Sequence, residues 1–160
     1  MYTCLFEQSF DGTPAIRDLV YDFHEDPNVY GLKGSFLWGR FVKVTVNIDT
    51  SKPNNGTFNA YFPAGKWYDY EGHSQFVSTG MNVSLKSGYD YTHVHFKQGS
   101  IIPVQDSSIA NDTNDLLFQP MRYIVFATPS GTAEGSVFLA NGMHEGEIIQ
   151  YFKLRYSERT

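Results

Sequence analysis

Two histidines separated by one residue are the first arrangement in this sequence that could do chemistry. Alternate residues of a β-strand point to the same face, so His93 and His95 could both reach one metal ion. No third ligand is evident nearby in the sequence. The alternative interpretation is a strand whose histidines face the surface while Val94 and Phe96 face the core. We therefore predict no metal-binding residue.

Three carboxylates lie close together in the sequence and could supply acid and base groups. These residues are Asp22, Glu25 and Asp26. Their spacing does not place two carboxyl groups on opposite sides of a substrate, as a catalytic acid and base would require. A solvated acidic loop explains the three residues without any catalytic role.

Aromatic residues near the middle of the chain could stack on sugar rings. Trp67, Tyr68 and Tyr70 are candidates for such a platform if they are exposed, and packing in the core and in a hairpin is the alternative. The sequence contains no phosphate-binding loop, no dinucleotide-binding glycine motif, no Gly-x-Ser-x-Gly elbow and no His-Glu-x-x-His motif. We therefore predict no catalytic residue and no cofactor.

Length and composition restrict the classes of function. The 160 residues can build a single core but not a two-domain enzyme. A net charge of -5 without a basic cluster disfavours nucleic-acid binding and a basic membrane patch. Hydrophobic residues make up 41% and charged residues 18%, which is typical of a folded chain, and the 16% of aromatic residues favours strands. The single cysteine, Cys4, excludes an internal disulfide and is predicted to be a small buried side chain.

The elements that would position these residues are mostly strands. A short helix over 2–9 ends at the turn formers Asp11 and Gly12, and the run 15–23, apolar at both parities, predicts a strand buried on two faces. Within 41–48 the even positions are aliphatic and the odd ones mostly polar, which predicts one buried and one exposed face. Turn signals about every ten residues are typical of an antiparallel sandwich. Further strands are predicted at 57–62, 67–70, 82–85, 121–128 and 135–140, in 91–104 on either side of the turn at Gln98-Gly99, and at most one in 150–160. An Asn-Gly hairpin is predicted at 53–56, and the polar segment 105–116 is predicted to be a linker or a long surface loop.

The sequence carries N-glycosylation sequons but no signal peptide of its own, and this combination leaves two interpretations open. No apolar stretch approaches the length of a membrane span, and the first residues lack the basic leader and apolar core of a signal peptide. Three glycosylation sequons begin at Asn55, Asn82 and Asn111. They are coincidental, or they are used in the secretory pathway with a signal that lies upstream of Met1. In the second case we expect a lysosomal, extracellular or membrane-tethered protein.

Four motifs in a fixed order carry a resemblance to a known family. They are Gly12-Thr13-Pro14-Ala15-Ile16-Arg17-Asp18-Leu19, Phe36-Leu37-Trp38-Gly39, Tyr61-Phe62-Pro63-Ala64-Gly65-Lys66-Trp67-Tyr68-Asp69 and His93-Val94-His95-Phe96-Lys97-Gln98-Gly99-Ser100-Ile101-Ile102-Pro103. Over about residues 1–142 the chain resembles the C-terminal portion of family 31 glycoside hydrolases, the α-glucosidases of the lysosomal and intestinal maltase type.

The resemblance implies a mainly β chain in three parts. Residues 1–30 would be a remnant of the end of a catalytic (β/α)8 barrel, with its last strand at 15–21. Residues 31–112 would form the proximal C-terminal antiparallel β-sandwich, and residues 113–160 would begin a second, distal β-sandwich that is incomplete. Arg17 matches a recurrent family arginine on the last barrel strand, for which packing is favoured over substrate contact.

Two positions depart from the family's usual pattern. Asp18 stands where the family usually has proline. Ala140-Asn141-Gly142 stands in place of the family's usual Asp-Asp-Gly.

The resemblance also implies an activity that these residues alone do not carry. Family members hydrolyse terminal α-linked glucose with retention, using an Asp nucleophile and an Asp acid/base on earlier barrel strands. No position here matches either motif, so this chain alone is predicted to be inactive. The implied partners are an α-glucoside or oligosaccharide substrate in the full-length enzyme and the absent barrel on which the sandwich packs. The barrel remnant and the incomplete distal sheet would leave unpaired strand edges and apolar faces, so the isolated chain is predicted to aggregate.

Two competing hypotheses remain at this point. The chain could be a non-catalytic β-sandwich that binds glycans or a partner glucosidase through its aromatic residues. A weaker hypothesis is metal binding through His93 and His95.

Overall fold

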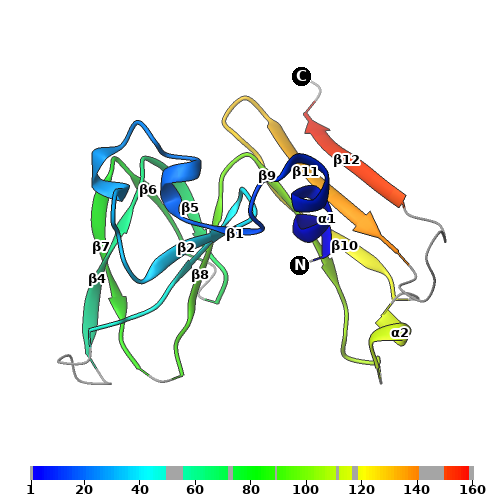
Figure 1. Cartoon of the computed structure of the whole chain (residues 1–160), viewed down its shortest axis with the longest axis horizontal. Helices are drawn as coiled ribbons and strands as arrows, with labels where there is room; N and C mark the ends of the chain where they lie inside the picture. The colour runs from blue at the N-terminus through cyan, green and yellow to red at the C-terminus, as the bar shows by residue number, and fades with distance from the viewer. Residues whose placement is uncertain are drawn as a thin grey trace. The chain divides into compact units, whose positions relative to one another are not determined.

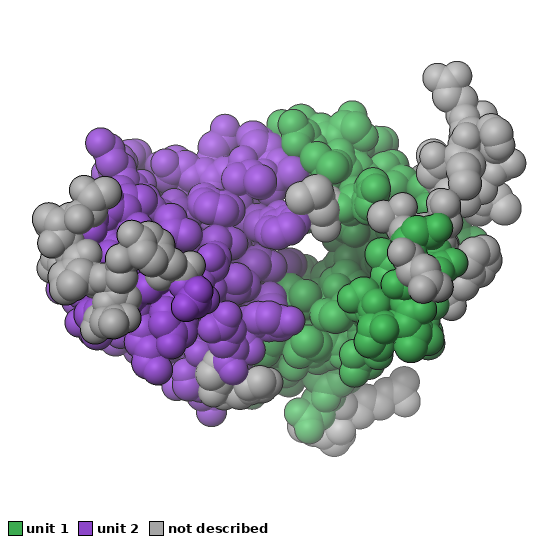
Figure 2. Space-filling view, turned by 90° about the horizontal axis from the view of Figure 1, so that it is seen from below, with its two compact units in different colours: residues 1–13, 99–160 green, residues 14–98 purple. Residues whose placement is uncertain are grey.

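The computed structural model of the chain divides into two compact units. Unit 2 is Pro14–Gln98, and unit 1 combines Met1–Thr13 with Gly99–Thr160 (Figures 1 and 2). The structure describes residues 2–49, 56–71, 74–88, 90–110, 112–116, 119–140 and 150–158, apart from the side chains of 113 and 114.

Unit 2 is an antiparallel β-sandwich formed by a large and a small sheet. The large sheet has the strand order β1-β2-β3-β8-β5-β6, and the small sheet pairs β4 with β7. Two 3-10 helices, η1 (Leu19–Tyr21) and η2 (Pro27–Val29), follow β1. The strands are β1 (Ile16–Arg17), β2 (Ser35–Trp38), β3 (Val42–Thr45), β4 (Thr57–Phe62), β5 (Gly65–Asp69), β6 (Gln75–Ser78), β7 (Met81–Lys86) and β8 (His93–Lys97).

The core of unit 2 has two clusters that differ in chemistry. Phe62 on β4 and Trp67 on β5 are fully buried and meet edge to face with ring centroids 5.6 Å apart. This is the aromatic geometry that electrostatics favours. The second cluster joins Leu19 of η1 and Val29 of η2 to Leu37 of β2, so the loop segments after β1 are anchored by apolar burial.

Unit 1 is a four-stranded sheet on which one helix packs. Its strand order is β10-β9-β11-β12, antiparallel except where β9 and β11 run parallel (Figure 1). The helix α1 stacks Phe6 on Phe138 of β11 with ring centroids 4.3 Å apart, and Glu7 accepts hydrogen bonds from the Ser136 and Tyr151 hydroxyls at 2.6 and 2.9 Å. The elements are α1 (Tyr2–Asp11), β9 (Ser100–Gln105), α2 (Thr113–Leu116), β10 (Met121–Phe126), β11 (Thr132–Leu139) and β12 (Gln150–Ser157).

Glycines allow two features of unit 1 that a side chain would prevent. Gly12 ends α1 with a φ of +76°, in the left-handed region that other residues rarely adopt. At Gly135 of β11, an added Cβ would lie 2.3 Å from the Ile101 carbonyl oxygen of β9. The close approach of these two strands therefore requires glycine.

The helices of the described residues include none that is long and apolar enough to cross a membrane. Of the α-helices in the part of the chain that the structure describes, the longer, α1, has ten residues.

Several sequence predictions need correction. The run 15–23 is not one two-face-buried strand, because only Ile16–Arg17 pairs with β2 and the following residues turn into η1. The supposed exposed face of 41–48 is wrong at Lys43 and Thr45, which are buried because β3 lies inside the large sheet with the small sheet over it. The strand β6 was not predicted, and the Asn-Gly hairpin at 53–56 lies largely outside the described residues.

The three-part domain division stays a prediction about a longer protein. The contacts of this chain join residues 14–30 with the sandwich strands, and they separate β8 from β9 at Gln98–Gly99. Residues 100–105 pair with β10 in unit 1 rather than with unit 2.

Candidate functional site

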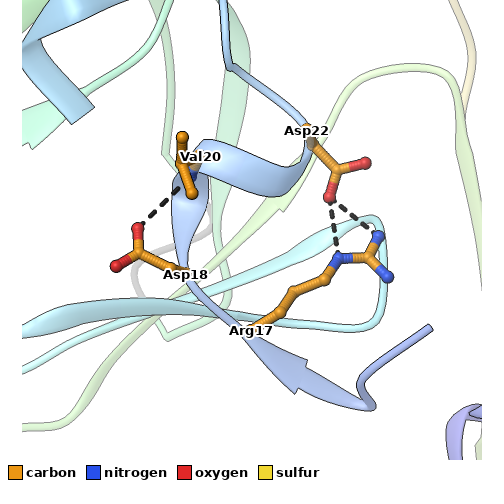
Figure 3. Close-up of polar contacts among 4 residues, drawn as sticks. All are labelled: Arg17, Asp18, Val20 and Asp22. Atoms are coloured by element: carbon orange, nitrogen blue, oxygen red, sulfur yellow. Dashed lines mark hydrogen bonds and ion pairs between the residues drawn. The ribbon is translucent and has the colours of Figure 1, made fainter. Parts of the chain in front are cut away.

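A buried ion pair joins the two ends of the first turn of unit 2. Arg17 on β1 donates from Nε and Nη2 to the same Oδ2 of Asp22, just after η1, at 3.0 and 2.7 Å (Figure 3). The two side chains are only 5% and 18% exposed. Charge-assisted bonds of this forked kind are among the stronger polar interactions in proteins. The guanidinium of Arg17 therefore holds η1 against β1.

Asp18, which lies between Arg17 and Asp22 in the sequence, caps the N-terminus of η1. Its Oδ1 accepts a hydrogen bond from the backbone N–H of Val20 at 3.2 Å, as an N-cap residue does (Figure 3). Its φ of -65° and ψ of 152° are angles that proline also adopts. The replacement of the family's usual proline thus keeps the backbone path and adds a cap.

The acidic residue Asp26 belongs to a hydrogen-bonded cluster rather than to a solvated loop. The Tyr61 hydroxyl on β4 donates to Asp26 Oδ2 at 2.5 Å, and Asn28 Nδ2 donates to Asp26 Oδ1 at 3.0 Å. The bond from Tyr61 lowers the pKa of Asp26, while burial, followed by Asp26 itself, raises the pKa of Tyr61. Of the three carboxylates only Glu25 is exposed, so the solvated-loop interpretation holds for that residue alone.

The two histidines of β8 share one face but differ in environment. His93 is half-buried, with Nε2 2.8 Å from the Lys86 carbonyl oxygen, whereas His95 is only 2% exposed. The surface interpretation is therefore wrong for His95, because β8 lies between β3 and β5 and the small sheet covers its histidine face. Among the described residues, no group of three or more potential ligands could hold a metal.

The buried amine of Lys43 lies beside His95, with which it pairs across β3 and β8. The sequence analysis missed it because alternation along 41–48 assigns Lys43 to the exposed face. Lys43 Nζ donates to Thr45 Oγ1 at 2.5 Å and to Ser35 Oγ at 3.2 Å, and lies 3.9 Å from the centroid of Phe62. Phe62 meets His95 edge to face at 4.8 Å. Burial lowers the pKa of Lys43 to about 7.

The His95 imidazole is the least satisfied group of this buried region. Its Nδ1 is the one buried side-chain nitrogen or oxygen of the described residues without a hydrogen-bond partner. Burial lowers the pKa of His95 to about 4, partly opposed by Asp69 on β5 and reinforced by Lys43 and His93. The imidazole is therefore neutral near pH 7.

Replacing Lys43 with methionine should stabilise unit 2. The substitution removes an amine whose charged form the core disfavours, and Ser35 Oγ still reaches Thr45 Oγ1 at 3.3 Å. We expect a gain of about 1–2 kcal/mol near pH 6 in urea unfolding, shrinking as pH rises. Lys43 titrates near 7 in the fold but near 10.5 when unfolded, so wild-type stability rises with pH across that window.

The matched control is Lys86→Met on the exposed face of β7, for which we expect a change within about 0.5 kcal/mol. A Lys43→Met variant less stable than the wild type at pH 6 would contradict the assignment of Lys43 as a disfavoured buried charge.

Acidification should destabilise unit 2 through His95. The unfolded imidazole binds a proton near pH 6.5 but the folded one only near 4, so the unfolded state holds more protons between these values. Stability is therefore greatest above pH 6.5 and falls by up to about 1.4 kcal/mol per pH unit as pH drops toward 4. In His95→Gln, the urea midpoint should fall less steeply between pH 6.5 and 4 than it does in the wild type. An unchanged pH slope would contradict the prediction.

The aromatic residues of β5 do not form an exposed platform. Trp67 is fully buried and its Nε1 donates to the Pro63 carbonyl oxygen at 3.0 Å, so the indole belongs to the core. Tyr68 is half-buried, and Tyr70, just after β5, is exposed. The hypothesis that Trp67 stacks on sugars is therefore corrected.

Of the three sequons, the structure describes one. Asn82 is exposed on β7, while Asn55 and Asn111 lie outside the described residues. Asn141, in the Ala140-Asn141-Gly142 segment that departs from the family's usual Asp-Asp-Gly, also lies outside them. Cys4 is half-buried on α1, less enclosed than predicted.

Comparisons with known proteins place this sandwich among the C-terminal domains of a family of glycosyl hydrolases. Residues 12–102 match the model of the glycosyl hydrolase family 31 C-terminal domain. An α-glucosidase of Hordeum vulgare is 34% identical over 88% of the chain, and a probable maltase-glucoamylase 2 of Homo sapiens is 31% identical over 89%. The chain spans 16% and 5% of these two relatives.

Solved structures share the fold. A glucosidase II alpha subunit superposes with a TM-score of 0.85 over 98% of this chain and 17% of its own, at 15% identity. A Flavobacterium johnsoniae GH31 dextranase gives a TM-score of 0.80 over 96% of this chain and 19% of its own, at 20% identity. The chain belongs to glycoside hydrolase family 31 and corresponds to the C-terminal domain of that family.

Proposed function

We propose that this chain is the C-terminal part of a hydrolase that releases terminal α-linked glucose, and that it supports a catalytic barrel without supplying the catalytic carboxylates. The observation that carries the proposal is the family match over 12–102 together with relatives named α-glucosidase. The carboxylates Asp22 and Asp26 are each bound within unit 2, to Arg17 and Tyr61, which fits a structural role.

The barrel in this proposal packs on apolar surface that each unit leaves exposed. In unit 2, β1 is a two-residue edge strand, and Ile16 and Tyr21 are both more than half exposed. In unit 1, the edge strand β10 exposes Tyr123, Ile124 and Val125 in succession, so neither face of it is covered. Such surfaces usually mark an interface.

The absence of this partner predicts self-association. The purified 160-residue chain should elute as polydisperse aggregate in size-exclusion chromatography with light scattering, because open edges and apolar faces pair with other copies. A monodisperse monomer that unfolds cooperatively would contradict the proposed interface.

Activity distinguishes the proposal from a stand-alone module. Purified chain should not hydrolyse maltose or a chromogenic α-glucoside. A longer in-frame product that includes an upstream barrel with two catalytic aspartates should do so. A stop codon directly upstream of the chain, or turnover by the 160 residues alone, would overturn the proposal.

The alternative of a glycan-binding module now rests on exposed tyrosines rather than on Trp67. Tyr70 and Tyr91 are 55% and 42% exposed. Calorimetric titration with maltose and longer α-glucans tests this function, and heat that disappears in Tyr70→Ala or Tyr91→Ala would favour it over a purely supporting role.

We also propose a secretory localisation. The mouse relative is named lysosomal α-glucosidase and a human relative is named intestinal sucrase-isomaltase, at 28% and 30% identity. A signal sequence upstream in the longer product is the observation that tests this proposal.

A further inference from the structure

A partly open cavity of about 280 Å³ is lined by residues of unit 2. Its walls are the segment around Gly34, the end of β3 with the residues that follow it, and β4 with its neighbour Asn82 on β7. The volume is near the lower limit of about 300–1,000 Å³ for ligand pockets, which suits a ligand the size of one sugar.

The lining of this cavity offers the groups that bind sugars. Among the lining residues, Lys33 and Asp49 carry opposite charges, Asn59 carries an amide, and Leu32 and Ile48 are apolar. Sugar hydroxyls and an N-acetyl group need hydrogen-bond donors and acceptors beside an apolar surface.

Asn82 lies at this cavity with its side chain free to react. It pairs in register with Tyr61 of β4, and Asn59 pairs with Ser84, so Asn59, Asn82 and Ser84 point to the same face of the small sheet. Asn82 and Ser84 are exposed, and neither makes a side-chain hydrogen bond with any part of the chain that the structure describes. The sequon's amide and hydroxyl are thus available together.

We propose that Asn82 carries an N-linked glycan whose first N-acetylglucosamine lies in this cavity. In the transfer, Asn82 Nδ2 forms a bond to the anomeric carbon of a lipid-pyrophosphate-linked sugar. The bond from that carbon to the pyrophosphate oxygen breaks, and the Nδ2 proton is released as the lipid pyrophosphate leaves. This inference rests on the secretory localisation proposed above. Asn82 is the sequon chosen because Asn82 itself lines the cavity.

The experiment supplies the localisation so that only the site is tested. The full chain is expressed in cultured animal cells behind a cleavable signal peptide, with one reporter sequon in a flexible C-terminal tail, and is recovered from detergent lysates. Glycopeptide mass spectrometry measures occupancy at Asn82 and at the reporter in the same molecules. We expect both to be occupied, with Asn82 occupancy lost in Ser84→Ala and retained in Ser84→Thr.

The position of the first sugar is tested on the same material. A glycoamidase that cuts the bond between sugar and asparagine is applied without denaturant. The reporter glycan should be released at least tenfold faster than the Asn82 glycan, and both should be released alike after denaturation. Asn59→Trp fills the cavity from an exposed position of β4 and should remove most of this protection.

Each outcome decides one part of the inference. An occupied reporter beside an unmodified Asn82 overturns the site, whatever the activity of the longer enzyme. If Asn82 is occupied but its glycan is released as fast as the reporter glycan, the first sugar does not lie in the cavity. Slow release of the Asn82 glycan that is unchanged in Asn59→Trp also overturns that position. Failure of the longer product to hydrolyse α-glucosides would instead overturn the proposed function and leave these measurements unaffected.

Discussion

Replacing Trp67 with alanine should destabilise unit 2 by about 3–5 kcal/mol, the range for removing a buried large aromatic side chain. The indole is fully buried and contacts Phe62 and Phe23 at centroid distances of 5.6 and 6.1 Å. A cavity of that size between two sheets cannot close, because strand pairing fixes the backbone on both sides. Since small domains have about 5–15 kcal/mol of stability in total, such a loss would remove a large part of it.

The measurement is urea unfolding followed by near-ultraviolet circular dichroism, which reports on packed aromatic residues. Trp67→Phe keeps a ring but loses the hydrogen bond to the Pro63 carbonyl oxygen, so we expect an intermediate loss. Val77→Ala on neighbouring β6 is the matched control, since Val77 is exposed and should change stability by less than about 0.5 kcal/mol. Equal effects of Trp67→Ala and Val77→Ala would show that the indole is not a core residue.

Breaking the buried ion pair should have the second largest effect. Asp22→Asn leaves the Arg17 guanidinium buried without a carboxylate, and we expect a loss of about 3 kcal/mol, at the lower end for buried pairs because Asp22 is 18% exposed. A second cation increases the effect, because Asp22 also raises the pKa of Lys97, whose own burial lowers it. Removing Asp22 therefore leaves two half-buried or buried cations near each other.

A double replacement separates the charges of the pair from the packing of its side chains. The combination Arg17→Met with Asp22→Leu removes both charges and should recover most of the stability lost in Asp22→Asn. The control pair is Arg122 and Asp106 in unit 1, with N–O 3.7 Å and side chains 69% and 48% exposed. Arg122→Met should change stability by less than about 1 kcal/mol. A double variant no more stable than Asp22→Asn would mean that η1 needs the charged groups themselves.

Local patterns in the sequence were sufficient to predict most elements. The helix α1 ends at Asp11–Gly12, as the turn formers indicated. Strands were found at 57–62 and 121–126, where strands were predicted, and at 150–157, where at most one strand was expected. The signal at these places is a run of β-branched and aromatic residues between turn formers, which depends only on the local sequence. The motif order likewise predicted the family, which the match over 12–102 confirmed.

Side-chain environments in unit 2 could not be predicted in this way. Lys43 and His95 carry polar groups at positions that alternation assigns to solvent, yet both are buried, because β3 and β8 are neighbours inside a six-stranded sheet covered by β4 and β7. Which face of a strand becomes core depends on the second sheet, and that sheet is formed by residues distant in the sequence.

The sequence by itself determined the strand content and the family, since these depend on local pattern and residue identity. Only the tertiary structure decided that Arg17 binds Asp22, that Trp67 is core rather than a sugar platform, and that the chain divides at Gln98–Gly99. Each of these depends on which distant segments share a sheet, because burial and pairing are properties of the assembled layers and not of neighbouring residues.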